Sequence, residues 1–313
     1  MVRRSEMSKR NPNKIKEGKT IYTVLVYVAV AFLCFLAVYP MYYVLIMSLS
    51  SPENAAQMNV YVIPKGFCVD AYKVLVQDPE MWRAYLNTII YVIPTTILML
   101  ATCVLVAYPL TYKRLMGRKF VNMFLLIPMY FGGGMIPTFL LINKLGLYDN
   151  PLSQILPVCF SIWNIILVKA FFSSIPESLR EAAKIDGANV YQILLKVYLP
   201  LSKPILAVIA VYTIVGVWNS WFNAMVYLPH TKWQPLQLYL RRVLIENTKQ
   251  ITEVLSPSAA QELARKQMSN AQLKYAMIIF TTLPVLFTYP FFQKYFVKGV
   301  MLGSLKEIGR AHV

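Results

Sequence analysis

Few side chains in this sequence have the types and spacing that bond-making chemistry needs. His230 is the only histidine outside the last six residues, which leaves little for acid–base catalysis or metal binding by histidine. Residues 13–20 nearly spell a phosphate-binding loop, but Asn13 stands where the first glycine should be, and an apolar run follows. No CxxC spacing occurs among Cys34, Cys68, Cys103 and Cys159. The sequence therefore predicts no catalytic centre, no metal site and no cofactor held by this chain.

Uncharged polar and aromatic side chains inside apolar stretches form a second group of candidates. Asn219 and Asn223 are four residues apart and would share one face of a helix, and Trp218 and Phe222 have the same spacing. Amides exchange hydrogen bonds with hydroxyl groups, and aromatic rings stack on the apolar face of a sugar. Trp218, Asn219 and Asn223 are therefore candidates for a substrate pathway, with Asn164 in an earlier run. The alternative is that these amides only hold helices together.

The densest pattern of small and charged residues lies between two apolar runs, at residues 176–200. We expect a first amphipathic helix before Gly187, a sharp turn at this glycine, and a second short helix that ends at Pro200. Such a helix–turn–helix knob would either lie on lipid headgroups or dock onto a partner protein.

The first helix of this knob is expected to begin at Pro176, a favourable first helical residue, with Ser173 and Ser174 as possible caps. Its predicted apolar face consists of Leu179, Ala182, Ala183, Ile185 and Ala188. The side chains predicted to point towards water are Arg180, Lys184 and Asp186.

Six apolar runs must position these residues, and crossing a membrane takes about 20 apolar residues as helix. The runs are residues 21–47, 88–110, 120–142, 155–172, 205–228 and 275–296. Each should be helical, because lipid offers no partner to an unpaired backbone group. The prolines expected to kink rather than end these helices are Pro94, Pro128, Pro137, Pro157, Pro284 and Pro290. Residues 132–134, three glycines, should weaken the third helix.

Composition excludes a soluble protein. Apolar residues make up 57% of the 313 positions and charged residues only 14%, so lipid must face much of the chain. The surplus of 31 basic over 14 acidic residues would suggest nucleic acid in a soluble protein, but here the basic residues cluster beside apolar runs. The sequence therefore predicts a membrane protein without a nucleic-acid partner.

Charge distribution predicts that both termini lie in the cytoplasm. The tail at residues 1–20 is strongly basic, and the second-to-third connection contains Lys113, Arg114, Arg118 and Lys119 without any acid. Residues 50–86 mix both signs and should lie outside. One segment that is predicted to be external, 229–274, departs from the rule that basic residues concentrate on the cytoplasmic side. It contains Arg241, Arg242, Lys249, Arg265, Lys266 and Lys274.

Residues 181–200 resemble the EAA signature of permease subunits of binding-protein-dependent ABC importers: Glu-Ala-Ala, three residues, Gly, nine residues, then Ile-x-Leu-Pro. The matching residues are Glu181, Ala182, Ala183, Gly187, Leu199 and Pro200, with Val197 in place of Ile. The resemblance implies that this knob is the coupling helix, which seats in a groove of the ATPase subunit. Glu177 lies one turn earlier, outside the signature, and is the natural control for Glu181.

Further stretches are similar to the carbohydrate branch of these permeases, of the maltose, multiple-sugar and oligosaccharide type. They are residues 175–189, 199–207, 215–228 and 296–306, together with 129–157, which is similar to the subset that transports larger saccharides. The resemblance covers residues 87–306. It implies an all-α polytopic fold with six transmembrane helices, of the type I ABC importer kind, in the plasma membrane. It also implies that the chain is a transport subunit and no enzyme, and that it translocates a carbohydrate, most simply an oligosaccharide.

The same resemblance implies the partners: a second, non-identical permease subunit, an ATPase dimer that binds ATP and Mg, an extracellular solute-binding protein, the carbohydrate, and membrane lipid. Two alternatives stay open. One is an importer of the same architecture for a non-sugar solute. The other is a self-contained secondary carrier, which usually needs membrane-embedded charge, and the apolar runs contain little.

The expected division of the chain follows these assignments. It comprises a basic tail (1–20), a first transmembrane helix (21–49), an extracellular segment (50–86), a permease core (87–300) with the coupling helix at 176–200, and a C-terminal tail (301–313). Residues 308–313 match the translation of a sequencing adapter and are expected to be an artefact.

Overall fold

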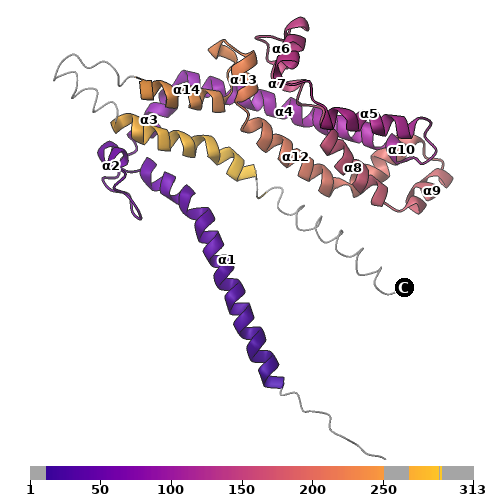
Figure 1. The fold of residues 1–313 in the computed structure, drawn as a ribbon, viewed down its shortest axis with the longest axis horizontal. Helices are drawn as coiled ribbons and strands as arrows, with labels where there is room; N and C mark the ends of the chain where they lie inside the picture. Colours follow the sequence, from indigo (N-terminus) through magenta and orange to yellow (C-terminus); the bar gives the residue numbers. More distant parts are fainter. Residues whose placement is uncertain (1–11, 250–267, 289, 291–313) are drawn as a thin grey trace, which may run out of the picture. The chain divides into compact units, whose positions relative to one another are not determined.

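The computed structural model describes residues 12–249, 268–288 and 290, and all regular structure in this part of the chain is helical (Figure 1). The all-α prediction is therefore confirmed. The chain forms two compact units, one of Met1–Ala71 with Gln261–Ile279 and one of Tyr72–Ala260 with Phe280–Val313. The predicted C-terminal tail, 301–313, lies outside the described residues.

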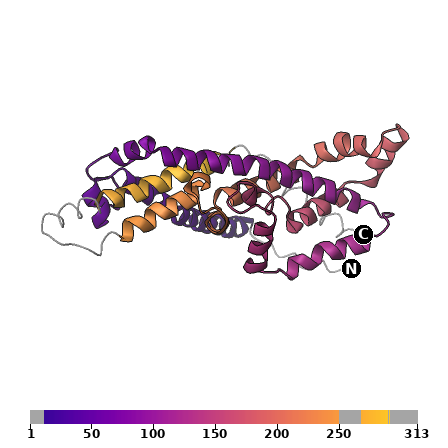
Figure 2. The same cartoon turned by 90° about the horizontal axis from the view of Figure 1, so that it is seen from above.

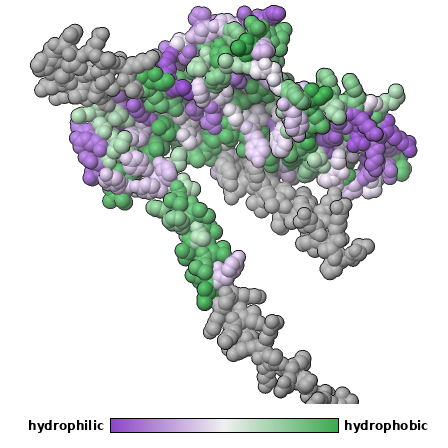
Figure 3. Space-filling model, viewed as in Figure 1, coloured by the Kyte–Doolittle hydropathy of each residue, from purple (hydrophilic) through white to green (hydrophobic). Residues whose placement is uncertain are grey.

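The first unit contains α1 (Pro12–Ser48) and α2 (Pro52–Gln57), and α3 (Asp70–Gln77) begins at its end. Residues 12–20, predicted as part of the tail, already belong to α1. The side chains of α1 from Ile21 to Val38 are exposed, and Figure 3 shows them as a continuous hydrophobic surface. A helical surface of this length and apolar character is suited to lipid.

The second unit contains the remaining labelled helices. They are α4 (Pro79–Ala107), α5 (Arg118–Tyr130), α6 (Met135–Lys144), α7 (Leu152–Ile155), α8 (Ile162–Ser174), α9 (Glu177–Ile185), α10 (Val190–Ile193), α11 (Leu199–Leu201), α12 (Lys203–Trp218), α13 (Phe222–Tyr227) and α14 (Leu236–Lys249). Short 3-10 turns lie at Pro109–Thr111 and Thr231–Trp233, and a π-helical turn lies at Leu194–Tyr198.

Helix α4 is the central element of the second unit and packs against α8, α12 and α14 (Figure 2). It begins well before the predicted start at residue 88, because Asp78 caps it by accepting from the Glu80 backbone N–H at 2.8 Å and Pro79 occupies the first turn. Pro94 lies inside the continuous helix, as predicted.

All six predicted apolar runs correspond to apolar helices in the described residues. Three of these are long and apolar enough to cross a membrane: Ile21–Ser48, Pro79–Thr111 and Met268–Thr288. Two bent pairs, Arg118–Tyr130 with Met135–Lys144 and Val190–Leu201 with Lys203–Trp218, raise this number to five if each pair is one span. The fourth run corresponds to the shorter apolar helix α8.

Three of the runs are broken. The third bends by 112° between α5 and α6 at the glycines, where Gly134 has a φ of 83°, so the predicted weakness is a complete break. Pro157 lies in a break between α7 and α8, so the prediction of one helix over 155–172 is wrong. The fifth run breaks at residues 219–221, between α12 and α13.

Candidate functional site

The knob, residues 176–200, is a helix–turn–helix as predicted. Helix α9 ends at Ile185, and Gly187 follows with a φ of 78° in the left-handed region that favours glycine. Its N–H donates to the Lys184 carbonyl at 3.0 Å, and the chain then turns into α10. Asn189 caps this second helix in a reciprocal capping box with Gln192.

The start of the knob differs from the prediction. Pro176 is the residue before α9, and the helix begins at Glu177 without a side-chain cap. The Ser174 hydroxyl instead donates to the Phe171 carbonyl of the preceding helix at 2.7 Å. The expectation that Ser173 or Ser174 caps α9 is therefore wrong, because Pro176, with extended backbone, separates the two helices.

Three aromatic rings anchor the knob to the cytoplasm-facing end predicted for α4 and α8. Tyr198 of the knob lies edge-on to Tyr108 at a centroid distance of 5.0 Å and to Phe172 at 5.5 Å. All three are buried, and so is Ile193 beside them. Edge-to-face contacts of this kind add to the burial of apolar area, so the base of the knob is firmly held.

Arg180 is the charged residue that sequence reasoning placed wrongly. It was expected to point towards water, but it is buried, at 8% exposed. Its guanidinium lies 4.6 Å from the centre of the Tyr112 ring and forms an ion pair with Glu177. The flat guanidinium group stacks on the aromatic face while its edge donates to the carboxylate. Arg180 thus joins α9 to the segment that follows α4.

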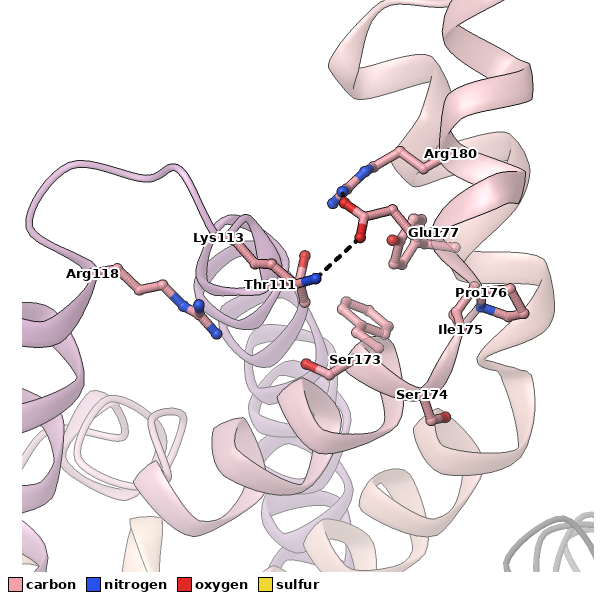
Figure 4. A pocket seen from close by; sticks show the side chains of 11 residues that line it. Thr111, Lys113, Arg118, Ser173, Ser174, Ile175, Pro176, Glu177 and Arg180 are labelled. Carbon is pink, nitrogen blue, oxygen red and sulfur yellow. Dashed lines mark hydrogen bonds and ion pairs between the residues drawn. The ribbon is translucent and has the colours of Figure 1, made fainter. Parts of the chain in front are cut away.

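Glu177 completes this junction through Lys113, whose Nζ lies 3.4 Å from the Glu177 Oε2. The hydrogen bond and charge of Lys113, with Arg180 beside it, hold the pKa of Glu177 below its usual range. Figure 4 shows these residues around an open cavity of about 480 Å³. Its lining comprises Thr111, Lys113, Arg118, Phe172, Ser173, Ser174, Ile175, Pro176, Glu177, Arg180 and Tyr198.

The opposite side of the knob is open. Ile185 is 87% exposed and Tyr191 74%, and Glu181 and Lys184 are exposed beside them. Hydrophilic residues gather at this end of the second unit (Figure 3). The predicted single apolar face is therefore split: Ala183 and Ala188 pack against the core, whereas Leu179 and Ile185 face outward. An exposed apolar side chain among charges is suited to a protein partner.

The structure places the predicted coupling residues on both sides of the knob. Exposed positions are Glu181, Ala182, Gly187 and Pro200, and partly buried positions are Ala183 and Leu199. The signature thus contains residues that shape the turn, residues that hold the base and residues available for contact.

The four predicted substrate-pathway residues are not one cluster. Trp218 is buried, pairs with Tyr85 at 5.5 Å and donates through its indole N–H to the Thr281 carbonyl at 3.0 Å. It does not pair with Phe222, whose ring lies edge-on to Trp221. Asn164 of α8 lies 3.6 Å from the Met99 sulfur. These contacts are the helix-holding kind that the alternative reading described.

Asn219 and Asn223 do not share a helical face, because α12 ends at Trp218 and Asn219 lies in the break before α13, which contains Asn223. Asn219 is exposed at the break and accepts from the Gln237 amide at 3.4 Å. Asn223 lies in α13, partly buried. The spacing rule fails here since a four-residue interval aligns side chains only on a continuous helix.

Sequence reasoning missed two groups of residues. The first group holds the first helix of the knob to the segment after α4 and consists of Tyr112, Lys113 and Arg180. The only sequence signal for this group was the three-residue interval from Glu177 to Arg180, which usually indicates an exposed pair. The second group lies at the break of the fifth run, where Arg241 of α14 stacks on Trp221. Neither contact between distant segments leaves a pattern in the sequence.

Known proteins resemble this chain over most of its length. A family model described as binding-protein-dependent transport system inner membrane component matches residues 104–302. Protein LplC of Bacillus subtilis is 34% identical over 87% of this chain and 90% of its own. The polygalacturonan/rhamnogalacturonan transport system permease protein YtcP of the same organism is 34% identical over 91% and 98%.

Among solved structures, a bacterial ABC transporter involved in the import of the acidic polysaccharide alginate matches with a TM-score of 0.79 and 33% identity, over 93% of this chain and all of that one. A family match that extends over more than half of the chain, with relatives above 30% identity along nearly its whole length, establishes the family. The chain belongs to the inner membrane components of binding-protein-dependent transport systems, and it is a membrane-embedded permease.

Proposed function

We propose that this chain is one of two permease subunits of an ATP-driven importer, that it translocates an oligosaccharide, and that residues 176–200 couple it to the ATPase. The observation that carries the proposal is the two-sided construction of the knob. Its base is fixed by buried aromatic rings and Arg180, and its outer face presents Ile185, Tyr191 and Glu181 to a partner.

This construction suits a mechanical connection. A partner that binds the outer face of the knob and moves would also move the base of the knob. The base packs on α4 and α8, which belong to the apolar core. ATP-driven closure of an ATPase dimer would then shift these helices and alternate the access of the pathway. An interfacial helix pair on lipid would need no buried arginine or ion pair at its base.

The carbohydrate cargo is supported by what similar proteins transport. YtcP is a permease for polygalacturonan and rhamnogalacturonan, and the similar solved structure imports alginate. The exposed amide of Asn219 and the aromatic rings beside the break in the fifth run are chemically suited to sugar hydroxyls and ring faces. A broken helix suits a pathway, because irregular backbone within a membrane is tolerated where it lines a cavity.

The assembly would contain this chain, a non-identical second permease, two ATPase subunits that bind ATP and Mg, and an extracellular solute-binding protein. Both termini and the knob would face the cytoplasm, and the segment after α13 would face the solute-binding protein. A non-sugar cargo or a self-contained carrier are the competing possibilities. The carrier would function without an ATPase.

The test is co-purification of the ATPase with the permease pair. Ile185→Asp places a charge in the centre of the outer face and should reduce the amount of bound ATPase at least tenfold, whereas the complex of the two permeases should form normally. Met116→Asp is the matched control, because Met116 is 94% exposed in the other connection predicted to be cytoplasmic. Equal ATPase recovery for both variants would remove the knob from the contact.

A further inference from the structure

The segment that follows the fifth apolar run is basic although it is predicted to lie outside. Residues 229–274 contain Lys232, Arg241, Arg242, Lys249, Arg265, Lys266 and Lys274 against Glu246, Glu253 and Glu262. Basic residues normally concentrate on the cytoplasmic side of membrane proteins. A surplus on the outer side therefore calls for a reason, and an anionic ligand would supply one.

Two adjacent arginines of α14 have opposite surroundings. Arg242 forms an ion pair with Glu80 at 2.5 Å, and its side chain is only 22% exposed, so it holds α14 to the start of α4. Arg241 is exposed, and among the described residues no carboxylate pairs with it.

Arg241 is nevertheless held in place. Its guanidinium carbon lies 3.6 Å from the centre of the Trp221 ring, at the break between α12 and α13. Stacking uses the flat face of the guanidinium and leaves its edge N–H groups free, in the geometry that binds a carboxylate with two parallel hydrogen bonds. A preorganised arginine loses less side-chain freedom when such a ligand binds.

Side chains suited to contact the rest of a sugar lie near Arg241, on α14 and at the break between α12 and α13. Trp221 precedes α13, and its ring is edge-on to Phe222 at 5.6 Å. Gln237 of α14 donates to the Asn219 side chain at 3.4 Å, and Asn219 donates to the Val215 carbonyl at 3.0 Å, so two exposed or half-buried amides are held in place at the break. The helices α13 and α14 pack against each other, so these four side chains belong to one assembly.

We infer that Arg241, Trp221, Gln237 and Asn219 form a subsite for an acidic sugar, a uronate unit whose carboxylate binds the edge of Arg241. This inference rests on the proposed function and narrows its cargo to uronate oligosaccharides. The carboxylate takes the free arginine donors, the amides meet the ring hydroxyls, and the indole borders the apolar sugar face. A neutral sugar would leave the arginine edge without a partner.

The experiment is uptake by proteoliposomes that contain the whole importer with its solute-binding protein. The probes are a tetragalacturonate, an alginate tetrasaccharide and the neutral maltotetraose, each at a concentration below saturation. The wild type should take up at least one uronate tetrasaccharide in preference to maltotetraose. Arg241→Gln should reduce that uptake about tenfold, the effect of losing one bidentate charged contact, and Arg241→Lys should restore part of it.

Lys232→Gln is the matched control. Lys232 is also exposed on the outer segment and lies over an aromatic ring, 4.5 Å from the centre of Trp233, but this is a different ring from the Trp221 ring that Arg241 contacts. Its uptake should stay within about twofold of the wild type if only the subsite matters. Equal losses for the two variants, or a wild type that prefers maltotetraose, would overturn the subsite while the importer function stands. Absence of ATP-dependent uptake of all three sugars would instead contradict the proposed function.

Discussion

The guanidinium of Arg180 lies 4.6 Å from the centre of the Tyr112 ring, and this contact joins the first helix of the knob to the segment after α4. A long, charged side chain at 8% exposure is unusual on a surface helix. It is tolerated here because Glu177 neutralises the charge and the tyrosine ring covers the face of the group.

Replacing Arg180 should therefore loosen the knob. Arg180→Ala removes a stacked and charge-paired group, and we expect a local loss of about 1–3 kcal/mol. The mutant should insert normally but hydrolyse ATP with less sugar moved per ATP, and α9 should be cut faster in limited proteolysis. Lys184→Ala is the control, since Lys184 is exposed and its Nζ lies 5.9 Å from the same ring. Identical proteolysis of the two variants would show that Arg180 does not hold α9.

The contacts of Glu177 with Lys113 and Arg180 should weaken only in acid. Because Lys113 and Arg180 lower the pKa of Glu177, its contribution to stability is present above the pKa of about 4.3 of an unfolded glutamate and is lost as the pH falls through the lower folded value. Proteolysis of α9 should not change between pH 6 and pH 8 and should accelerate below about pH 4. Glu177→Gln should abolish this dependence. If acid still accelerated the proteolysis of Glu177→Gln, the pH dependence would belong to another titratable group.

The same contacts change the choice of control for Glu181. Sequence reasoning selected Glu177 because it lies outside the signature, but Glu177→Lys would place two lysines beside a buried arginine. Ser178, exposed on α9 and without a part in this junction, is the better position.

Variants at two glycines can distinguish the effect of backbone strain from the effect of lost contact with a partner. Gly187 has a φ of 78° and Gly117 a φ of 73°, and an added Cβ would meet no atom within 4 Å at either one. An alanine at each should cost about 1 kcal/mol through strain alone. We expect Gly187→Ala to reduce uptake several-fold more than Gly117→Ala, because only the former lies in the knob. Equal uptake for the two variants, measured at matched expression, would contradict a special role for this turn.

Trp218 and Asn219 are neighbours with different expected roles. Trp218→Phe loses the hydrogen bond to the Thr281 carbonyl and should destabilise the protein by about 1 kcal/mol without changing the sugar concentration for half-maximal uptake. Asn219→Ala should raise this concentration and lower the melting temperature less than Trp218→Phe does, because the hydrogen bonds of its amide to the Val215 carbonyl and to Gln237 are exposed to water. Melting curves and uptake titrations distinguish the two. A reversed pattern would make Trp218 the substrate contact.

Local chemistry made part of this structure predictable from the sequence. The turn at Gly187, the break at three consecutive glycines and the helical nature of the apolar runs depend on backbone geometry and on the lack of hydrogen-bond partners in lipid. Arg180 could not be placed this way, because its burial depends on Tyr112, nearly 70 residues earlier in the chain. The early start of α4 was missed because the hydropathy of its first residues is low, although Asp78 and Pro79 spell a helix start.

In the proposed mechanism, ATP hydrolysis by a partner moves sugar through this permease by way of the knob. The most direct test of this mechanism is uptake of an oligosaccharide and ATP hydrolysis, measured side by side in proteoliposomes that contain the whole importer, with Glu181→Lys compared with Ser178→Lys. We expect uptake that requires ATP and the ATPase, a loss of at least tenfold in Glu181→Lys, and near-normal uptake in Ser178→Lys. Uptake without the ATPase, or a Glu181→Lys variant as fast as the wild type, would contradict this mechanism.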